Sequence, residues 1–170
     1  MKILEIWKKV CEISERLNAD PYHVMAIVPT ESYGDPLADS GYARGLMQLS
    51  KIALKDVNNY YGMKFRYGDL YDPEIALEAG IRYLKLLTMR LGGILKRVPT
   101  VAELAMAWNW GVGHVKKWLT SAPENSAIDE AVPKETKAHV LDVMWYYARL
   151  KRDGEKFLKE VERWKGSFGR

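Results

Sequence analysis

The sequence has 170 residues, of which 48% are hydrophobic and 28% are charged, enough to bury the core of one domain without disulfide bonds or metal ions. Its formal charge of +4, from 26 basic and 22 acidic residues, is mild and spread along the chain, so nucleic acid is not the expected partner. No stretch approaches the roughly 20 apolar residues of a membrane span, and residues 1–9 lack the apolar core of a signal peptide.

The first part of the chain predicts two helices that end at a glutamate. Apolar residues recur at steps of three and four from Ile3 onward and predict a helix that ends near Asn18. Asp20 and Pro21 are an N-cap and first-turn pair, so a second helix begins there and carries the apolar residues 24–28 up to Glu31. Pro29 removes one helical amide, so we expect a kink or a loosened last turn.

Helical spacing continues through the rest of the chain. Residues 33–45 are predicted to form a loop with at most a short extended or hairpin piece, 45–61 a helix, and 62–72 another loop. Pro73 begins a strongly periodic helix that should end at Gly92-Gly93, and Thr100 with Glu103 forms a capping box for the next helix, which stops at Gly111 or Gly113.

The C-terminal part predicts a polar loop over 121–131, a helix over 133–147, and a last charged helix after Gly154 that ends near residue 164. No linker, repeat or low-complexity run divides the sequence. The prediction is therefore a single mainly-α domain over 1–170, with packed helices and little or no β-structure.

Glu31 is the residue of greatest chemical interest. A glutamate that follows an apolar helix is held partly out of water, which disfavours its charged form and raises its pKa toward the range of a general acid. Glycosidic cleavage requires such an acid, because the leaving oxygen must receive a proton. Taken alone, a glutamate at a helix end is more often simply exposed to solvent.

The residues around Glu31 resemble a known signature. Glu31-Ser32-x-x-x-Pro36, then Ser40, then Ala-Arg-Gly-Leu-Met-Gln over 43–48, resembles the soluble lytic transglycosylase family, within the goose-type lysozyme superfamily. Segments 71–84, 103–111 and 133–140 match the same family in the same order, so the motif-bearing core covers about 20–147 and a C-terminal helical extension follows at about 150–166. The resemblance implies a lysozyme-like fold and cleavage of peptidoglycan glycan strands.

By the same resemblance, Glu31 is the catalytic acid and the glycan groove is lined by Ser40, Met47, Gln48, Asn109 and Glu135. Trp108 is added to the predicted groove residues as a ring on which a sugar can stack. The Gln48 amide would bond to sugar or N-acetyl groups, and Gly45 would let the backbone approach the substrate. Met47 suits the core and the groove wall equally well.

Several positions depart from the family pattern. Tyr42 stands near a customary glycine, Trp108 and His139 replace tyrosines, and Trp110 replaces a small alanine. The indole of Trp108 still offers one hydrogen-bond donor and a face for sugar stacking.

The implied reaction is the lytic transglycosylase reaction at the bond between N-acetylmuramic acid and N-acetylglucosamine, with Glu31 as acid and then base and a 1,6-anhydromuramoyl end as product. Two alternatives stay open: a hydrolytic muramidase that uses Asp39 to activate water, and a wall-binding or assembly protein without turnover. No cofactor or metal is predicted, since the three histidines lack metal-ligand spacing and suit surface or capping roles. The chain is expected to act as a monomer.

Site of action and source are open at this point. The substrate lies outside the cytoplasm, so periplasmic, extracellular or phage-delivered action on the cell wall is expected although no export signal is visible. A phage lysin and a bacterial wall-remodelling enzyme both fit. The abundance of charged residues and the presence of a single glutamine suggest a heat-adapted source.

Overall fold

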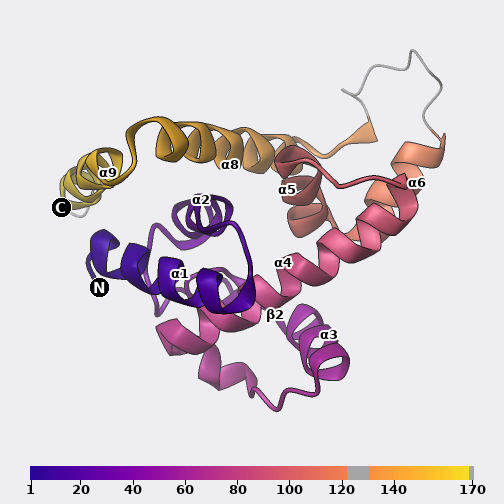
Figure 1. Ribbon diagram of the computed structural model, residues 1–170, viewed down its shortest axis with the longest axis horizontal. Coiled ribbons are helices and arrows are strands. Elements are labelled where there is room, and N and C mark those ends of the chain that lie inside the picture. The colour runs from indigo at the N-terminus through magenta and orange to yellow at the C-terminus, as the bar shows by residue number, and fades with distance from the viewer. Residues whose placement is uncertain (122–130, 169–170) are drawn as a thin grey trace.

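The computed structural model describes residues 1–121 and 131–168 and is mainly α-helical, as predicted (Figure 1). Its helices are α1 (Ile3–Leu17), α2 (Pro21–Ser32), α3 (Lys51–Tyr61), α4 (Pro73–Leu95), α5 (Val101–Trp110), α6 (Val112–Ser121), α8 (Lys134–Asp153) and α9 (Glu155–Phe168), with a 3-10 helix, η1 (Tyr67–Tyr71). Two short strands, β1 (Ala43–Arg44) and β2 (Leu49–Ser50), form an antiparallel hairpin.

Helix α2 forms the centre of the main core. Its residues 24–28 are an unbroken apolar run and are fully buried, because α1 packs on one side of the helix and α8 on the other (Figure 1). The predicted start is confirmed: the Asp20 carboxylate accepts a hydrogen bond from the Tyr22 amide at 2.9 Å, and Pro21 occupies the first turn. The helix continues through Pro29 to Ser32, so Glu31 lies in its last turn.

A second, smaller core lies beneath the hairpin. This core contains Leu49 of β2, Leu54 of α3 and Leu70 of η1, which pack together, and Ala79 of α4 completes the cluster. Tyr83 and Trp108 pack against both cores. The two clusters therefore meet along α4 and α5, beside the end of α2.

The predicted helix over 45–61 begins later than expected, at Lys51. Gly45 and Gln48 adopt positive φ angles of 75° and 45°, which a continuing helix does not allow. The residues before Lys51 form the second half of the hairpin, and the Ser50 hydroxyl caps α3 by accepting a hydrogen bond from the Ala53 amide at 3.2 Å.

Two further boundaries differ from the prediction. Helix α4 runs through Gly92-Gly93 to Leu95. Gly92 faces the returning chain, where a Cβ atom would lie 3.3 Å from the Arg97 carbonyl oxygen and 3.5 Å from Pro99. Sequence periodicity did not identify α6, and α8 and α9 both extend beyond the predicted ends. The predicted loop over 121–131 lies almost entirely outside the described residues.

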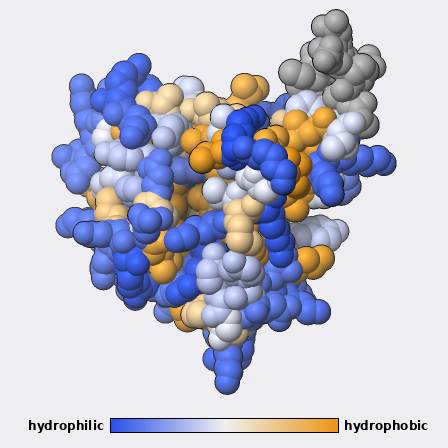
Figure 2. Space-filling view, turned by 45° about the vertical axis from the view of Figure 1, so that its right-hand side comes forward, coloured by the Kyte–Doolittle hydropathy of each residue, from blue (hydrophilic) through white to orange (hydrophobic). Residues whose placement is uncertain are grey.

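The ends of the described chain meet at one side of the molecule, where α9 packs against α1 (Figure 1). The Ile3 amide donates a hydrogen bond of 2.6 Å to the Glu162 carboxylate. Figure 2 shows a face on which hydrophilic groups are spread widely, with hydrophobic groups between them. Within the described ranges, no helix combines the length and the apolar character needed to cross a membrane.

Candidate active site

The last turn of α2 is anchored to the hairpin by Ser32. Its hydroxyl donates a hydrogen bond of 2.8 Å to the Leu46 carbonyl and accepts one of 3.2 Å from the Gly34 amide. Tyr33 ends the helix in a left-handed conformation, φ 52°, with its amide bonded to the Pro29 carbonyl. These contacts fix the position of Glu31 relative to the hairpin.

Glu31 is mostly shielded from solvent, with 17% of its side chain exposed. Burial, aided by the negative charge of Glu135, raises the pKa of its carboxyl group to about 7, against the opposing effect of a hydrogen bond from the Trp108 side chain. The only donor on an indole is its ring N–H. The predicted rise in the pKa is therefore confirmed, and Glu31 can hold and release a proton near neutral pH.

His139 on α8 also faces Glu31. Its Nδ1 atom lies 3.5 Å from Glu31 Oε1, and burial lowers the pKa of the imidazole to about 4, so the ring is neutral at pH 7. The expected surface or capping role is wrong for His139 and for His23, since both are buried where α8 packs along α2. Only His114 contacts a helix end, with Nδ1 2.8 Å from the Trp110 carbonyl oxygen.

A cavity of about 290 Å³ opens beside Glu31. Its walls come from both cores: the end of α2, the hairpin, the start of α3, the middle of α4, the end of α5 and the start of α8. The lining residues are Glu31, Tyr42, Ala43, Gln48, Leu49, Ser50, Ala53, Tyr83, Trp108, Asn109 and Glu135.

The structure brings Gln48, Trp108, Asn109 and Glu135 together with Glu31 in this cavity, so four of the six predicted groove residues lie beside the predicted acid. Asn109 is held by Thr136 of α8, whose hydroxyl donates a hydrogen bond of 2.8 Å to the Asn109 side-chain oxygen. A donating amide group therefore remains for a ligand.

Gln48 has fewer free hydrogen-bonding groups for a ligand than the sequence predicts. Its side-chain NH₂ donates to the carbonyl oxygens of Ala38 at 3.0 Å and Gly45 at 3.1 Å, so it holds the loop together. Only its carbonyl oxygen remains to accept a bond from a sugar. Gly45 approaches the protein rather than the substrate, because a Cβ atom there would lie 2.0 Å from the Leu70 carbonyl oxygen.

Two predicted groove residues lie outside the cavity. Met47 is fully buried, and its side chain occupies the space that a Cβ atom on Gly80 would fill, so the structure places it in the core. Ser40 stabilises the turn before β1: its hydroxyl accepts a hydrogen bond from the Ala43 amide at 3.1 Å. These placements correct the assignment of both residues to the groove wall.

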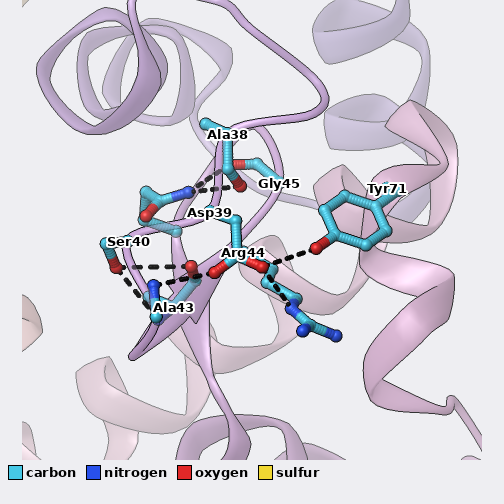
Figure 3. Close-up of polar contacts among 9 residues, drawn as sticks. Ala38, Asp39, Ser40, Ala43, Arg44, Gly45 and Tyr71 are labelled. Atoms are coloured by element: carbon cyan, nitrogen blue, oxygen red, sulfur yellow. Dashed lines mark hydrogen bonds and ion pairs between the residues drawn. The ribbon is translucent and has the colours of Figure 1, made fainter.

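Asp39 lies in a separate polar network at the base of the hairpin (Figure 3). Its carboxylate accepts hydrogen bonds from the Tyr71 hydroxyl at 2.6 Å, the Gly41 amide at 2.7 Å and the Arg44 guanidinium at 3.0 Å. The bond from Tyr71, followed by that from Gly41, lowers the pKa of Asp39. Asp39 does not line the cavity, which makes it a poor partner for Glu31.

Comparison with known proteins identifies the family of the chain. A family model described as the transglycosylase SLT domain matches residues 9–130. The chain belongs to this family. A relative of this SLT domain from Serratia proteamaculans, named membrane-bound lytic murein transglycosylase C, is 34% identical over 120 residues, which are 66% of this chain and 33% of that protein.

Solved structures show the same lysozyme-like fold. The 70 kDa soluble lytic transglycosylase from Escherichia coli is 28% identical, with a TM-score of 0.64 over 82% of this chain and 23% of that one. The lytic transglycosylase Slt from Pseudomonas aeruginosa is 23% identical, with a TM-score of 0.70 over 86% of this chain and 24% of that one. The SLT domain described here thus spans a third or less of the length of these proteins.

Among the residues at the site that were not assigned to it from the sequence, three have ring side chains. Tyr42 and Tyr83 line the cavity, and His139 contacts the acid. Tyr42 and His139 stand where the SLT domain departs from the family pattern, so the departures themselves were the available signal. The ring of Tyr83 packs edge-on against that of Trp108, with 5.3 Å between the ring centroids.

The site offers no arrangement suited to a metal ion. Among the described residues, no cluster of three or more His, Cys, Asp or Glu side chains has the geometry to hold one.

Proposed function

We propose that this chain is a lytic transglycosylase that cuts the glycan strands of peptidoglycan between N-acetylmuramic acid and N-acetylglucosamine. The observation that carries the proposal is the Glu31 carboxyl group, which lies in the wall of a cavity and has a pKa of about 7. Near pH 7 such a group is protonated in a large fraction of molecules, so it can act as an acid, and its conjugate base is strong enough to take a proton back.

The reaction proceeds in two proton transfers on this one residue. Glu31 first donates its proton to the glycosidic oxygen as the C1–O bond of the muramoyl sugar breaks, and the N-acetyl oxygen of that sugar stabilises the positive charge at C1. The Glu31 carboxylate then removes the proton from the C6 hydroxyl of the same sugar, and O6 bonds to C1. The product is a 1,6-anhydromuramoyl end, and no water molecule is consumed.

The cavity walls support the binding of a sugar in this position. Trp108 presents an aromatic ring and Asn109 an amide donor, the kinds of group that bind a pyranose face and an N-acetyl carbonyl. The exposed ring of Tyr42 extends the same wall along the hairpin. We assign the glycan strand to this groove and the site of action to the cell wall.

Hydrolysis is the second candidate, and Glu135 is the reason to consider it. It places another carboxyl group in the cavity, and its charge contributes to the raised pKa of Glu31. An inverting hydrolase requires a base on the far side of the sugar from its acid. Asp39, the candidate from the sequence, is replaced in this role by Glu135.

Mass spectrometry of the fragments released from purified peptidoglycan tests the proposal. We expect muropeptides lighter by one water than hydrolytic products with the wild-type chain and with Glu135→Gln, and none with Glu31→Gln. Reducing ends that disappear with Glu135→Gln would establish hydrolysis instead. Release by Glu31→Gln at the wild-type rate would end the assignment of the acid, and binding without release by all three proteins would favour a wall-binding function.

A further inference from the structure

The contact between His139 and Glu31 joins the two helices that form the back of the site. His139 Nδ1 lies 3.5 Å from Glu31 Oε1, and both side chains are mostly buried, with 7% and 17% exposed. A distance of 3.5 Å is long for a hydrogen bond, but contacts to catalytic groups commonly shorten when the substrate closes the site. The geometry therefore brings one imidazole nitrogen to one carboxyl oxygen.

The proton on the imidazole can be assigned from the surroundings of its second nitrogen. Nε2 of His139 is buried and has no hydrogen-bond partner among the described residues. A buried N–H without an acceptor costs more than a buried lone pair, and the nitrogen that has a polar partner normally determines the tautomer. The proton therefore resides on Nδ1 and points at Glu31.

The imidazole is neutral when it makes this contact. Burial lowers the pKa of His139 to about 4, well below the value at which Glu31 titrates. Three other titratable groups lie at the cavity: Glu135, one turn earlier on α8, Tyr83 on α4 and Tyr42 on the hairpin. Helix α5 contributes Trp108 and Asn109, which do not titrate. The contact is thus a neutral donor facing a carboxyl group rather than an ion pair.

We propose that His139 is a positioning residue for the acid: it donates its Nδ1 proton to Glu31, orients the carboxyl group toward the cavity and favours its ionised form. Together with the indole N–H of Trp108, it gives the buried carboxylate two neutral donors. This matters in the second proton transfer, when Glu31 must exist as a carboxylate before it removes the C6 hydroxyl proton. The inference rests on the proposed function for its catalytic meaning, although the contact itself does not depend on turnover.

Nuclear magnetic resonance tests the contact without any substrate. Nitrogen shifts of His139 should show a neutral ring with the proton on Nδ1 between pH 5 and 8. A proton on Nε2, or a charged ring in this range, would overturn the proposal. Titration of the Glu31 carboxyl carbon should give an apparent pKa that rises by about one pH unit in His139→Phe, because a donor to the charged form is lost.

Two comparisons separate this effect from a general change in packing. His139→Tyr restores a donor on a ring like that of phenylalanine, so the titration of Glu31 should return most of the way to the wild-type value. His23→Phe removes another buried neutral histidine on the same pair of helices, away from the cavity, and should leave Glu31 unchanged. Equal values in His139→Phe and His139→Tyr would show that only packing changed.

The pH profile of peptidoglycan cleavage connects the contact to the reaction. The alkaline limb of kcat/KM should move to higher pH in His139→Phe and return in His139→Tyr, and kcat should fall more than KM changes. If the wild-type chain releases no fragments while Glu31 still titrates as described, the proposed function fails and the His139 contact stands. If cleavage is normal and its profile is the same in all variants, the role of His139 is refuted and the proposed function stands.

Discussion

The carboxyl group of Glu31 keeps its proton in the folded chain over a pH range in which the unfolded chain has lost it. The pKa is about 7 in the folded state against an ordinary 4.5, so the free energy of unfolding falls as the pH rises through this window. Glu31→Gln removes the penalty, because an amide does not ionise. Its free energy of unfolding should exceed that of the wild type by about 1 to 3 kcal/mol at pH 8 and by little at pH 4.

Urea unfolding of both proteins at these two pH values measures the difference. Glu12→Gln, at an exposed position on α1, controls for the loss of a surface charge. A gain in stability that is equal at pH 4 and pH 8 would mean that Glu31 is not held in its protonated form by burial. The same variant should be inactive, so stability and activity are expected to change in opposite directions at this residue.

The hydrogen bond between Thr136 and Asn109 is a second contact at the site that a single substitution can test. Thr136 is buried, and its hydroxyl is the group that orients Asn109 in the cavity wall. Thr136→Val keeps the shape of the side chain and loses the donor, which should cost about 1 kcal/mol of stability. We expect KM for peptidoglycan fragments to rise severalfold, since Asn109 is then free to turn away.

Steady-state kinetics on soluble glycan fragments measure this effect. Thr88→Val on α4 is the matched control, because that hydroxyl donates only to the Leu84 carbonyl of its own helix, at 2.8 Å. An unchanged KM in Thr136→Val, with the expected loss of stability, would show that Asn109 does not bind the substrate.

Among the elements, the hairpin depends on a contact that only the folded chain contains. Gly45 has a φ of 75°, and a Cβ atom there would lie 2.0 Å from the Leu70 carbonyl oxygen. Gly41 has a similar φ of 83° but open space around it. Gly41→Ala should therefore cost about 1 kcal/mol, from backbone strain alone, and Gly45→Ala more than about 3 kcal/mol.

Chemical unfolding of the two variants compares them directly. Gly45→Ala should also reduce cleavage, because Gln48 donates to the Gly45 carbonyl and helps to form the cavity wall. Equal losses of stability in both variants would mean that the hairpin can move away from η1 without cost.

These elements also show what could be predicted from the sequence. The starts of α2 and α5 were predicted correctly because their caps are local: Asp20 precedes Pro21, and Thr100 and Glu103 bond reciprocally at 3.2 and 2.8 Å. The start of α3 was predicted wrongly because the conformation of Gly45 is imposed by Leu70, 25 residues away along the chain. Helical periodicity contains no information about such an approach.

The site residues also divide into those that local motifs identify and those whose position depends on contacts far away along the chain. The motifs selected Glu31, Gln48 and Glu135, which the fold brings to one cavity. Met47 could not be assigned between core and groove, since its burial is decided by the absence of a side chain at Gly80 on another helix. The sequence predicts a surface or capping role for His139, because its burial depends on how closely α8 packs against α2.

At the scale of the whole molecule, ion pairs connect the C-terminal part of α8 to α9. Arg149 on α8 bonds to Asp153 at 3.0 Å and to Glu160 of α9 at 2.9 Å, and Arg152 shares Asp153. The Arg149 guanidinium also lies 4.6 Å from the centre of the Phe157 ring. Networks of this kind keep their stabilising effect at high temperature better than isolated pairs, because the free energy cost of desolvating charges falls as temperature rises.

The heat-adapted source suggested by the composition can be tested on this network. We expect a Tm above the mesophile range of about 45 to 65 °C, and a decrease of about 3 to 8 °C in Arg149→Met, which leaves Asp153 and Glu160 without their shared partner. Arg66→Met is the control: Arg66 is 86% exposed and pairs only locally with Asp69, so its loss should change Tm by about 2 °C or less. Scanning calorimetry at low and at high salt separates the two, since salt screens the exposed pair more strongly than the network. A wild-type Tm within the mesophile range would exclude heat adaptation, and equal effects of the two substitutions would show that the contact between α8 and α9 depends on apolar packing rather than on charge.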